Sequence, residues 1–206
     1  MPPRRRLSPA DRRAQLLAVA AQCFAAHTYD EVLMEDVAER AGVSRALLYR
    51  HFPSKRDLFA ALYRQVAEQL LAKTRFDPAD SLVEQLTEGL DAHIEYFAEN
   101  RNTVLAANRV LAGDHLIRTI IADELDALRE GLLGVLPHAD ADEATRAAVS
   151  GVLKSWLVFV QVLCVDWLAD PHCTRTELRD VCIGAVLGAI RPLLPEDPAP
   201  DWPRRT

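Results

Sequence analysis

The sequence MEDVAERAGVSRALLYRHF occupies residues 34–52, and its pattern is that of two short helices joined by a tight turn. Its first half places four apolar residues on one helical face: Met34, Val37, Ala38 and Ala41. Gly42 follows at the position where a residue in the left-handed conformation commonly ends a helix. Ser44 can cap a second helix that runs to about His51.

These residue types suit a helix-turn-helix. Ala38 and Ala41 are small enough to let the two helices approach closely where they cross. Val43 and Leu48 are apolar anchors that can hold the second helix against the first. The outer face of the second helix is then left free, and a DNA major groove admits one α-helix.

A further helix is predicted on each side of this unit. Upstream, Ser8 can act as the N-cap, Pro9 suits the first helical position, and Asp11 suits the first turn. The apolar face of that helix comprises Leu16, Val19, Ala20, Cys23 and Phe24. Downstream, Ser54 can cap a long helix whose apolar residues are spaced by four: Leu58, Leu62, Val66 and Leu70.

The rest of the chain is also predicted to be helical. Helices are expected at about 80–99, 102–112, 114–136, 142–169 and 174–194, with a turn at 137–140. No stretch alternates as a strand would. We therefore expect an all-α fold with a helix-turn-helix domain at 1–56, a helical domain at 57–194 and a disordered tail at 195–206.

Charge is unevenly distributed between these parts. Residues 1–56 hold ten Lys or Arg and six Asp or Glu, a net charge of +4. Because the whole chain carries −6, residues 57–206 carry −10. A basic head on an acidic body suits a nucleic-acid partner at one end, although a solvated basic tail would give the same balance.

Several other classes of protein find no support in the sequence. There is no Gly-rich phosphate loop, HExxH or GxSxG motif, which argues against an enzyme, and no spacing of His, Cys or Asp indicates a metal or cofactor site. No unbroken run of about 18 apolar residues predicts a membrane span. Charged residues follow Arg4–Arg6 where a signal peptide needs an apolar segment, so we expect a cytoplasmic protein.

Residues 16–63 resemble the N-terminal domain of TetR-family transcriptional regulators. The matching positions include Asp36-Val37-Ala38, Ala41-Gly42-Val43-Ser44 and Leu48-Tyr49-x-His51-Phe52-x-Ser54-Lys55-x-x-Leu58. The resemblance covers about a quarter of the chain. It implies a homodimer that binds a two-fold symmetric double-stranded DNA operator and responds to a small-molecule effector.

The resemblance also implies roles for single residues. Ser44, Arg45 and Ala46 would open the recognition helix and face base edges. Leu47 would lie beside them, either on a thymine methyl or in the core. Arg50 would reach bases or phosphate. The predicted phosphate contacts are Tyr49, His51 and Lys55, where the alternatives are a partly buried tyrosine and a structural histidine. Arg4, Arg5 and Arg6 are either a DNA-contacting arm or a solvated tail.

One departure from the family pattern affects the start of the second helix. Leu33 stands where the family usually has a capping Thr or Ser that also touches phosphate. We expect Asp30 to supply the cap instead. Leu33 and Leu47 together favour one alternative function, a helical ligand-binding or interaction protein that does not bind DNA.

In the body, the resemblance implies a four-helix dimer interface made by the last two helices. The segment 142–169 is apolar nearly all round, and Gly184 and Gly188 would allow close approach in the last helix; the alternative is the core of a monomeric bundle. The family also encloses a ligand cavity, which an apolar or aromatic molecule would suit. The candidate lining residues are His93, Tyr96, Phe97, Asn108, Trp156, Phe159 and Gln161, each of which is otherwise an ordinary core or surface residue.

Overall fold

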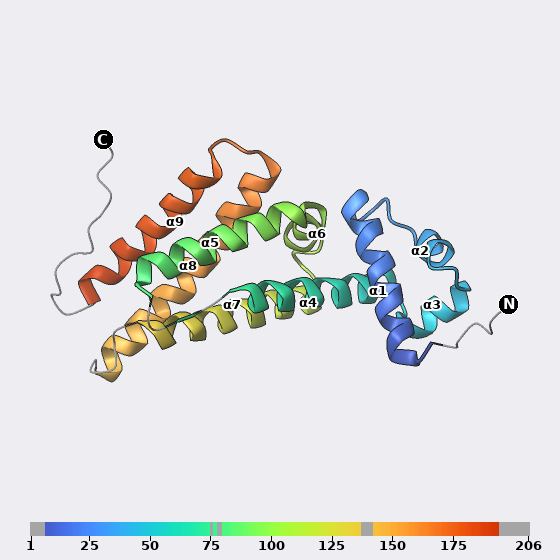
Figure 1. Cartoon of the computed structure of the whole chain (residues 1–206), viewed down its shortest axis with the longest axis horizontal. Coiled ribbons are helices and arrows are strands. Elements are labelled where there is room, and N and C mark those ends of the chain that lie inside the picture. Colours follow the sequence, from blue (N-terminus) through green and yellow to red (C-terminus); the bar gives the residue numbers. More distant parts are fainter. Residues whose placement is uncertain (1–6, 75, 78–79, 137–141, 194–206) are drawn as a thin grey trace.

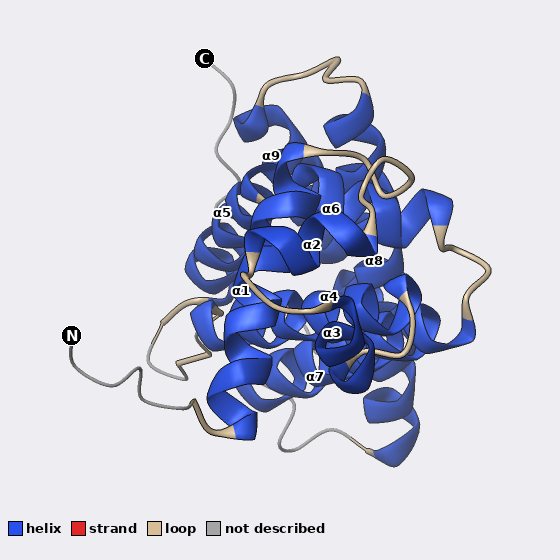
Figure 2. Cartoon of the chain, turned by 90° about the vertical axis from the view of Figure 1, so that its right-hand side faces the viewer, coloured by secondary structure: helices blue, strands red, loops and turns tan. Residues whose placement is uncertain are grey.

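The computed structural model describes residues 7–74, 76–77, 80–136 and 142–193, and every element within these ranges is helical (Figure 2). The elements in chain order are α1 (Pro9–Ala26), α2 (Met34–Arg40), α3 (Arg45–His51), α4 (Lys55–Lys73), α5 (Leu82–Glu99), α6 (Arg101–Leu105), the π-helical segment η1 (Ala106–Val110), α7 (His115–Val135), α8 (Glu143–Ala169), α9 (Arg175–Ile190) and the 3-10 segment η2 (Arg191–Leu193). The predicted all-α class is confirmed.

The molecule is elongated (Figure 1). Helices α1–α3 form a head at one end, α5–α9 form the body, and α4 runs from the head along the body. Within the body, α4 packs on α7, α7 on α8, and α8 on α9, while α5 contacts α4, α8 and α9. The head is thus joined to the body both through α4 and through the contact of α1 with α6.

The predicted helix starts in the head are confirmed at three serines. The side chains of Ser8, Ser44 and Ser54 each accept a hydrogen bond from the backbone N–H three residues on, at 3.1–3.2 Å. These bonds satisfy N–H groups that have no partner inside the helix. The three serines therefore determine where α1, α3 and α4 begin.

The turn between α2 and α3 has the predicted geometry. Gly42 has φ = 64°, in the left-handed region that a side chain disfavours. Its N–H donates to the carbonyl oxygen of Glu39, and the Val43 N–H donates to that of Ala38, both at 3.0 Å. This pair of bonds is the Schellman arrangement, which ends α2 and redirects the chain into α3.

The predicted cap of α2 is wrong. Leu33 precedes the helix in extended conformation and no side chain caps it; the Asp30 side chain makes no such bond. Asp30 lies in the turn after α1, where its carbonyl oxygen faces the Lys55 Nζ atom at 3.5 Å. The polar side chain is therefore too early in the chain to reach the first turn of α2.

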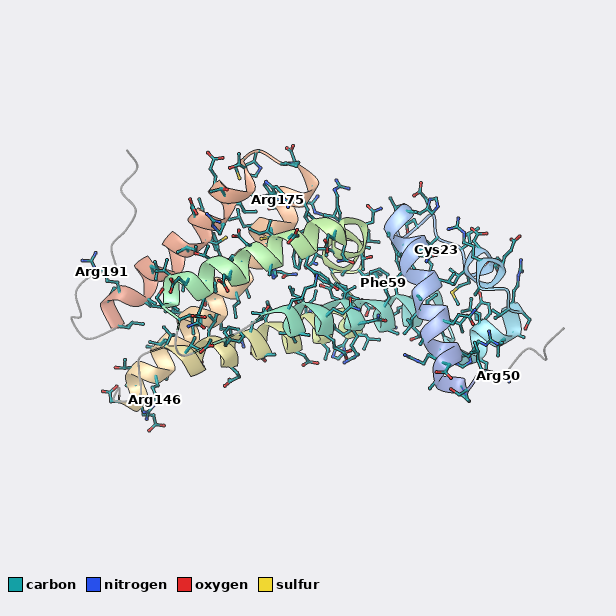
Figure 3. The ribbon with its side chains drawn as sticks, in the orientation of Figure 1. Cys23, Arg50, Phe59, Arg146, Arg175 and Arg191 are labelled. Carbon is teal, nitrogen blue, oxygen red and sulfur yellow. The ribbon has the colours of Figure 1, made fainter. Side chains whose placement is uncertain are left out.

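Aromatic side chains join the head to α4. Phe59 is fully buried, and its ring packs edge-on against Phe24 of α1 at 5.1 Å and against Tyr29 at 5.2 Å between ring centroids. One turn further along α4, Tyr63 stacks on Phe59 at 6.3 Å. Figure 3 labels Phe59 at this junction of head and body.

The single helix predicted at 102–112 is two segments. The α-helix ends at Leu105 and a π-helical stretch follows from Ala106 to Val110. Asn108 lies within the π-helical stretch, where its side chain donates to the Val104 carbonyl oxygen at 2.9 Å and accepts from Gln161 of α8 at 2.9 Å. The periodicity of apolar residues does not predict a π-helical turn. Such turns frequently occur near functional sites.

Helix α8 is strongly apolar, as its sequence predicts. By length and composition it is apolar enough to cross a membrane, although no unbroken apolar run is present. In the structure it packs between α7 and α9 and contributes many core side chains, Trp156 and Leu153 among them. This burial is what a core helix requires.

Three predicted features lie outside the described residues: the arginines Arg4–Arg6, the turn at 137–140 and the tail at 195–206.

Candidate nucleic-acid interface and internal cavity

The outer face of α3 is polar and exposed. Leu48 points inward and is fully buried, which anchors the helix to the head. Arg45, Ala46 and Arg50 are exposed, as is Tyr49 with 42% of its surface accessible. Figure 3 labels Arg50 at the end of the molecule away from the body. The structure thus brings the predicted base-reading residues onto one free helical surface.

Arg45 forms an ion pair with Glu35. Its guanidinium lies 3.3 Å from the Glu35 carboxylate of α2, while its side chain remains 68% exposed. An ion pair this exposed contributes little stability and is readily exchanged for another acceptor. The ion pair therefore holds the Arg45 side chain along the surface of α3 but can be replaced by a contact with another acceptor.

The remaining predicted residues of α3 differ in exposure. Ser44 is exposed, but its hydroxyl is occupied as the helix cap. Leu47 and His51 are half-buried, and the His51 ring lies beside Phe52 at 6.5 Å between centroids. Leu47 is thus neither fully in the core nor fully on the surface.

Lys55 has partners inside the head. Its Nζ atom donates to the carbonyl oxygens of Tyr29 at 2.9 Å and Val32 at 3.1 Å, and lies 4.5 Å from the centroid of the Tyr29 ring. These contacts use the ammonium protons to fix the α1–α2 turn on the start of α4. Sequence reasoning missed this arrangement because the acceptors are backbone groups of a loop more than 20 residues away.

Two polar contacts fasten the head to the body. Arg56, in the first turn of α4, pairs with Asp114, which is the N-cap of α7. Asn102 of α6 donates to the Ala25 carbonyl oxygen of α1 at 2.8 Å. The pairing with Arg56 and the N–H groups of α7 together lower the pKa of Asp114, although burial opposes them. These bonds hold α1 and the start of α4 against the body.

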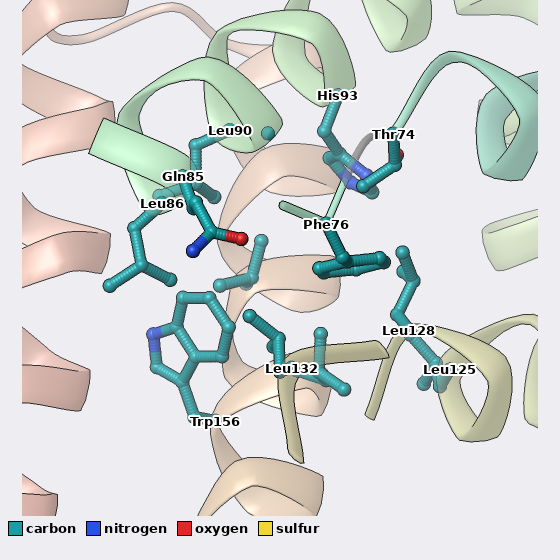
Figure 4. A pocket seen from close by; sticks show the side chains of 13 residues that line it. Thr74, Phe76, Gln85, Leu86, Leu90, His93, Leu125, Leu128, Leu132 and Trp156 are labelled. Carbon is teal, nitrogen blue, oxygen red and sulfur yellow. The ribbon is translucent and has the colours of Figure 1, made fainter. Parts of the chain in front are cut away.

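The body contains a cavity of about 50 Å³ between α5, α7 and α8, next to the segment that follows α4 (Figure 4). Its walls are mostly apolar: Phe76, Leu86, Gly89, Leu90, Leu125, Leu128, Leu132, Trp156, Leu157 and Val160, with the polar residues Thr74, Gln85 and His93. Of the predicted ligand residues, His93 and Trp156 line this cavity. Figure 4 labels both among the lining side chains, with His93 near the Phe76 ring.

The other predicted ligand residues lie elsewhere. Phe97 is buried behind His93, with ring centroids 4.0 Å apart. Tyr96 donates from its hydroxyl to Gln69 of α4 at 2.8 Å, and Asn108 pairs with Gln161. Phe159 is 40% exposed and lies in a shallow groove between α8 and α9, because its position on α8 faces away from α5 and α7.

Two features of the body could not be predicted from the sequence. Glu124 of α7 is 4% exposed, and its Oε1 atom has no hydrogen-bond partner among the described residues. Burial raises the pKa of Glu124 to about 7. Phe76 packs so closely on Gly131 of α7 that a Cβ atom there would overlap the ring. A glutamate and a glycine in an amphipathic helix carry no sequence signal for such roles.

An apolar surface runs along α8 and α9. Four exposed side chains mark it: Val158, Phe159, Val162 and Val181. Beside them, the groove between the helices is lined by small residues, including Gly151, Ala185 and Ala189. Small side chains allow another helix to approach closely, and exposed apolar patches on one face are typical of an interaction surface.

Comparison with known proteins gives a consistent assignment. A family model described as "Bacterial regulatory proteins, tetR family" matches residues 16–62. An HTH-type transcriptional regulator of Mycobacterium tuberculosis is 30% identical over 196 residues, which is 85% of this chain and 94% of that protein. The "Probable acrEF/envCD operon repressor" of Escherichia coli K12 is 31% identical over 171 residues, covering 71% of this chain and 76% of that protein.

A third relative matches a smaller part of the chain. The HTH-type transcriptional activator FasR of Mycolicibacterium smegmatis is 39% identical over 70 residues, 34% of this chain and 32% of that protein. Among solved structures, a tetR-family transcriptional regulator of Streptomyces coelicolor superposes with a TM-score of 0.74 at 21% identity, over 91% of this chain and 90% of the other. The family model, the fold and the Mycobacterium tuberculosis relative that matches 85% of this chain all agree. The chain therefore belongs to the TetR family of DNA-binding transcriptional regulators.

Proposed function

We propose that this regulator is a cytoplasmic homodimer that represses transcription by occupying a two-fold symmetric operator and leaves it when a small molecule fills the cavity between α5, α7 and α8. TetR-family regulators bind DNA operators, dimerise and bind small-molecule effectors. One relative is named an operon repressor and another an activator. We favour repression because the relative named as a repressor matches 71% of this chain, whereas the relative named as an activator matches 34% of it.

The course of α4 carries this proposal. The helix starts at Lys55 under the head and ends at Lys73, directly before Thr74 on the cavity wall. At 1.5 Å per residue its 19 residues span about 28 Å. A ligand that displaces Thr74 would therefore tilt α4, and the head, which is attached at the other end of this helix, would move with it. Two heads moved in this way no longer match successive major grooves.

In this proposal α3 is the recognition helix. Arg45 and Arg50 reach base edges or nearby phosphates, with Ser44, Ala46 and Leu47 beside them, while Tyr49 and His51 position the head on the backbone. Lys55 supports the interface by fixing the α1–α2 turn. The functional division follows residues 1–56 for DNA and 57–194 for the effector and the partner protomer.

The dimer is proposed to form through α8 and α9. Their exposed valines and the groove of small residues provide a self-complementary surface of the kind that a two-fold interface needs. A dimer doubles the contacts with a symmetric operator, whereas a single head binds weakly. No catalytic activity is proposed for the chain.

The test is selection of duplexes from a random pool by the purified full chain at near-physiological salt, followed by sequencing. A two-fold symmetric enriched site is expected. Arg45→Ala should relax the preference at one position of each half-site and weaken binding by about 1–3 kcal/mol per half-site. Arg175→Ala, at the exposed start of α9, is the matched control and should leave the selected sequence unchanged.

Two results would contradict the proposal. A pool that stays random with and without candidate effectors would exclude operator recognition. Unchanged discrimination by Arg45→Ala would exclude the assigned reading of bases. Repression itself is tested by a reporter placed behind the selected site, whose output should fall when the protein is expressed.

A further inference from the structure

The polar groups on the wall of the cavity are almost all occupied by bonds within the protein. The Thr74 hydroxyl donates to the Leu70 carbonyl oxygen at 3.1 Å. The Gln85 amide donates to the Asp80 carbonyl oxygen and accepts from the Asp77 N–H, at 3.0 and 3.2 Å. The Trp156 indole N–H donates to the Cys182 carbonyl oxygen at 2.8 Å. Each of these groups therefore already has a hydrogen-bond partner within the protein.

His93 is the exception. It lines the cavity, it is 7% exposed, and its Nε2 atom has no hydrogen-bond partner among the described residues. A buried polar atom without a partner costs free energy that a suitably placed ligand group would recover. The imidazole packs against the Phe97 ring, with centroids 4.0 Å apart and the ring planes tilted by 37°, and this contact holds the imidazole in place.

The charge of the site restricts the ligand further. Burial lowers the pKa of His93 to about 4, so the imidazole is neutral near pH 7. The lining residues within the described chain include no Asp, Glu, Lys or Arg. A carboxylate or an ammonium group placed here would lose its hydration without gaining an opposite charge. A neutral imidazole can donate to a carbonyl oxygen or accept from a hydroxyl, depending on its tautomer.

We infer that the effector is an uncharged, predominantly apolar molecule with one carbonyl or hydroxyl group, and that this group hydrogen-bonds to Nε2 of His93. This inference rests on the proposed function of the cavity as the effector site. It makes His93 the residue that selects for polarity, while Leu90, Leu128 and Trp156 select for apolar bulk.

The test is calorimetric titration of the full chain with a matched probe series: butylbenzene, 4-phenylbutan-1-ol, 4-phenylbutan-2-one, 4-phenylbutanoate and 4-phenylbutylammonium. The alcohol or the ketone should bind about tenfold more tightly than either charged compound, given a net gain of about one hydrogen bond. His93→Leu should lose about tenfold in affinity for that compound while retaining butylbenzene. His93→Gln, which keeps a donor and an acceptor, should retain part of the preference.

His115→Leu is the matched control, because His115 is an exposed histidine at the start of α7. Its affinities should equal those of the wild-type chain. Tightest binding of the carboxylate or the ammonium compound would overturn the inference, and so would equal affinity of wild type and both His93 variants for the alcohol and the ketone. Those results leave the cavity as a ligand site. Failure of every probe, butylbenzene included, would instead reject both the inference and the proposed effector site.

Discussion

The Nζ atom of Lys55 lies 2.9 Å from the carbonyl oxygen of Tyr29 and 4.5 Å from the centroid of the same residue's ring. One ammonium group therefore holds both the backbone and the side chain of the α1–α2 turn against the start of α4. The head of this regulator is stabilised at the point where it meets the helix that would move it.

Lys55→Met is expected to destabilise the head. The substitution keeps the length of the side chain but leaves the Tyr29 and Val32 carbonyl oxygens without their donor, which should lower the free energy of unfolding by about 1–3 kcal/mol. Urea denaturation measures the change. Lys154→Met, at an exposed position of α8, is the control and should alter stability little.

The same variant separates the two roles proposed for Lys55. If the lysine acts through the fold, the dependence of operator affinity on salt concentration should keep its wild-type slope. The structural role would be contradicted by two results together. The free energy of unfolding of Lys55→Met would be unchanged, and the slope of log affinity against log salt concentration would fall by about 0.9, the change expected when the protein neutralises one phosphate fewer. Those results would assign Lys55 to the DNA backbone.

The head could be predicted from its sequence because its determinants are local. Ser8, Ser44 and Ser54 cap helices within three residues of themselves, and the turn at Gly42 ends α2 through bonds that span at most five residues. The cavity depends on contacts between distant segments. Phe76 meets Gly131, and Asn108 meets Gln161, across 50 or more residues. Periodicity marks such residues as core without indicating which of them face one another.

Glu124 should make stability fall as the pH rises. Its pKa is about 7 in the folded chain and about 4.5 when unfolded, so between these values the folded state binds more protons than the unfolded state. The resulting stabilisation is complete below about pH 4.5 and is lost as the pH rises through 7. Glu124→Gln should therefore gain stability relative to wild type between pH 5 and pH 8, on the order of 2–3 kcal/mol.

Wild type and Glu124→Gln must be compared at each pH, because His93 has the opposite effect on the pH dependence of stability. Burial lowers the pKa of His93 to about 4, so its contribution is present above about pH 6.5 and is lost as the pH falls toward 4. Since both chains carry His93, the difference between them isolates Glu124. A difference that does not vary with pH, measured by urea denaturation, would show that Glu124 titrates normally.

Gly131→Ala should displace the Phe76 ring from the cavity wall. A methyl group at position 131 overlaps the ring, whereas one at Gly134 of the same helix meets nothing within 4 Å. Gly134→Ala is thus the control and should stabilise α7 by about 0.5–1 kcal/mol through helix propensity. Gly131→Ala should instead destabilise the chain by about 1–3 kcal/mol through overpacking.

A double-mutant cycle assigns this cost to Phe76. In a Phe76→Ala background the obstacle is gone, so adding Gly131→Ala should become stabilising to the same degree as Gly134→Ala. Additive free energies of unfolding would mean that the alanine meets some other group. Butylbenzene should also bind more tightly to Gly131→Ala than to wild type, because the ring that occupies part of the space has moved.

Val162→Asp is expected to dissociate the dimer. Val162 is 55% exposed on α8, among the apolar residues of the proposed interface, where a carboxylate would be buried against its two-fold copy or a neighbouring apolar side chain. Sedimentation velocity should show a dimer for wild type and a monomer for the variant at the same micromolar concentration. Val110→Asp is the matched control, since Val110 is equally exposed, at 54%, but belongs to η1 and is not among the residues that mark the apolar surface of α8 and α9. Val162→Asp should also lose most of its operator affinity, because each separated protomer makes only half of the contacts with the operator. Its helical circular dichroism should be retained. A dimer that persists in Val162→Asp would place the interface elsewhere on the molecule.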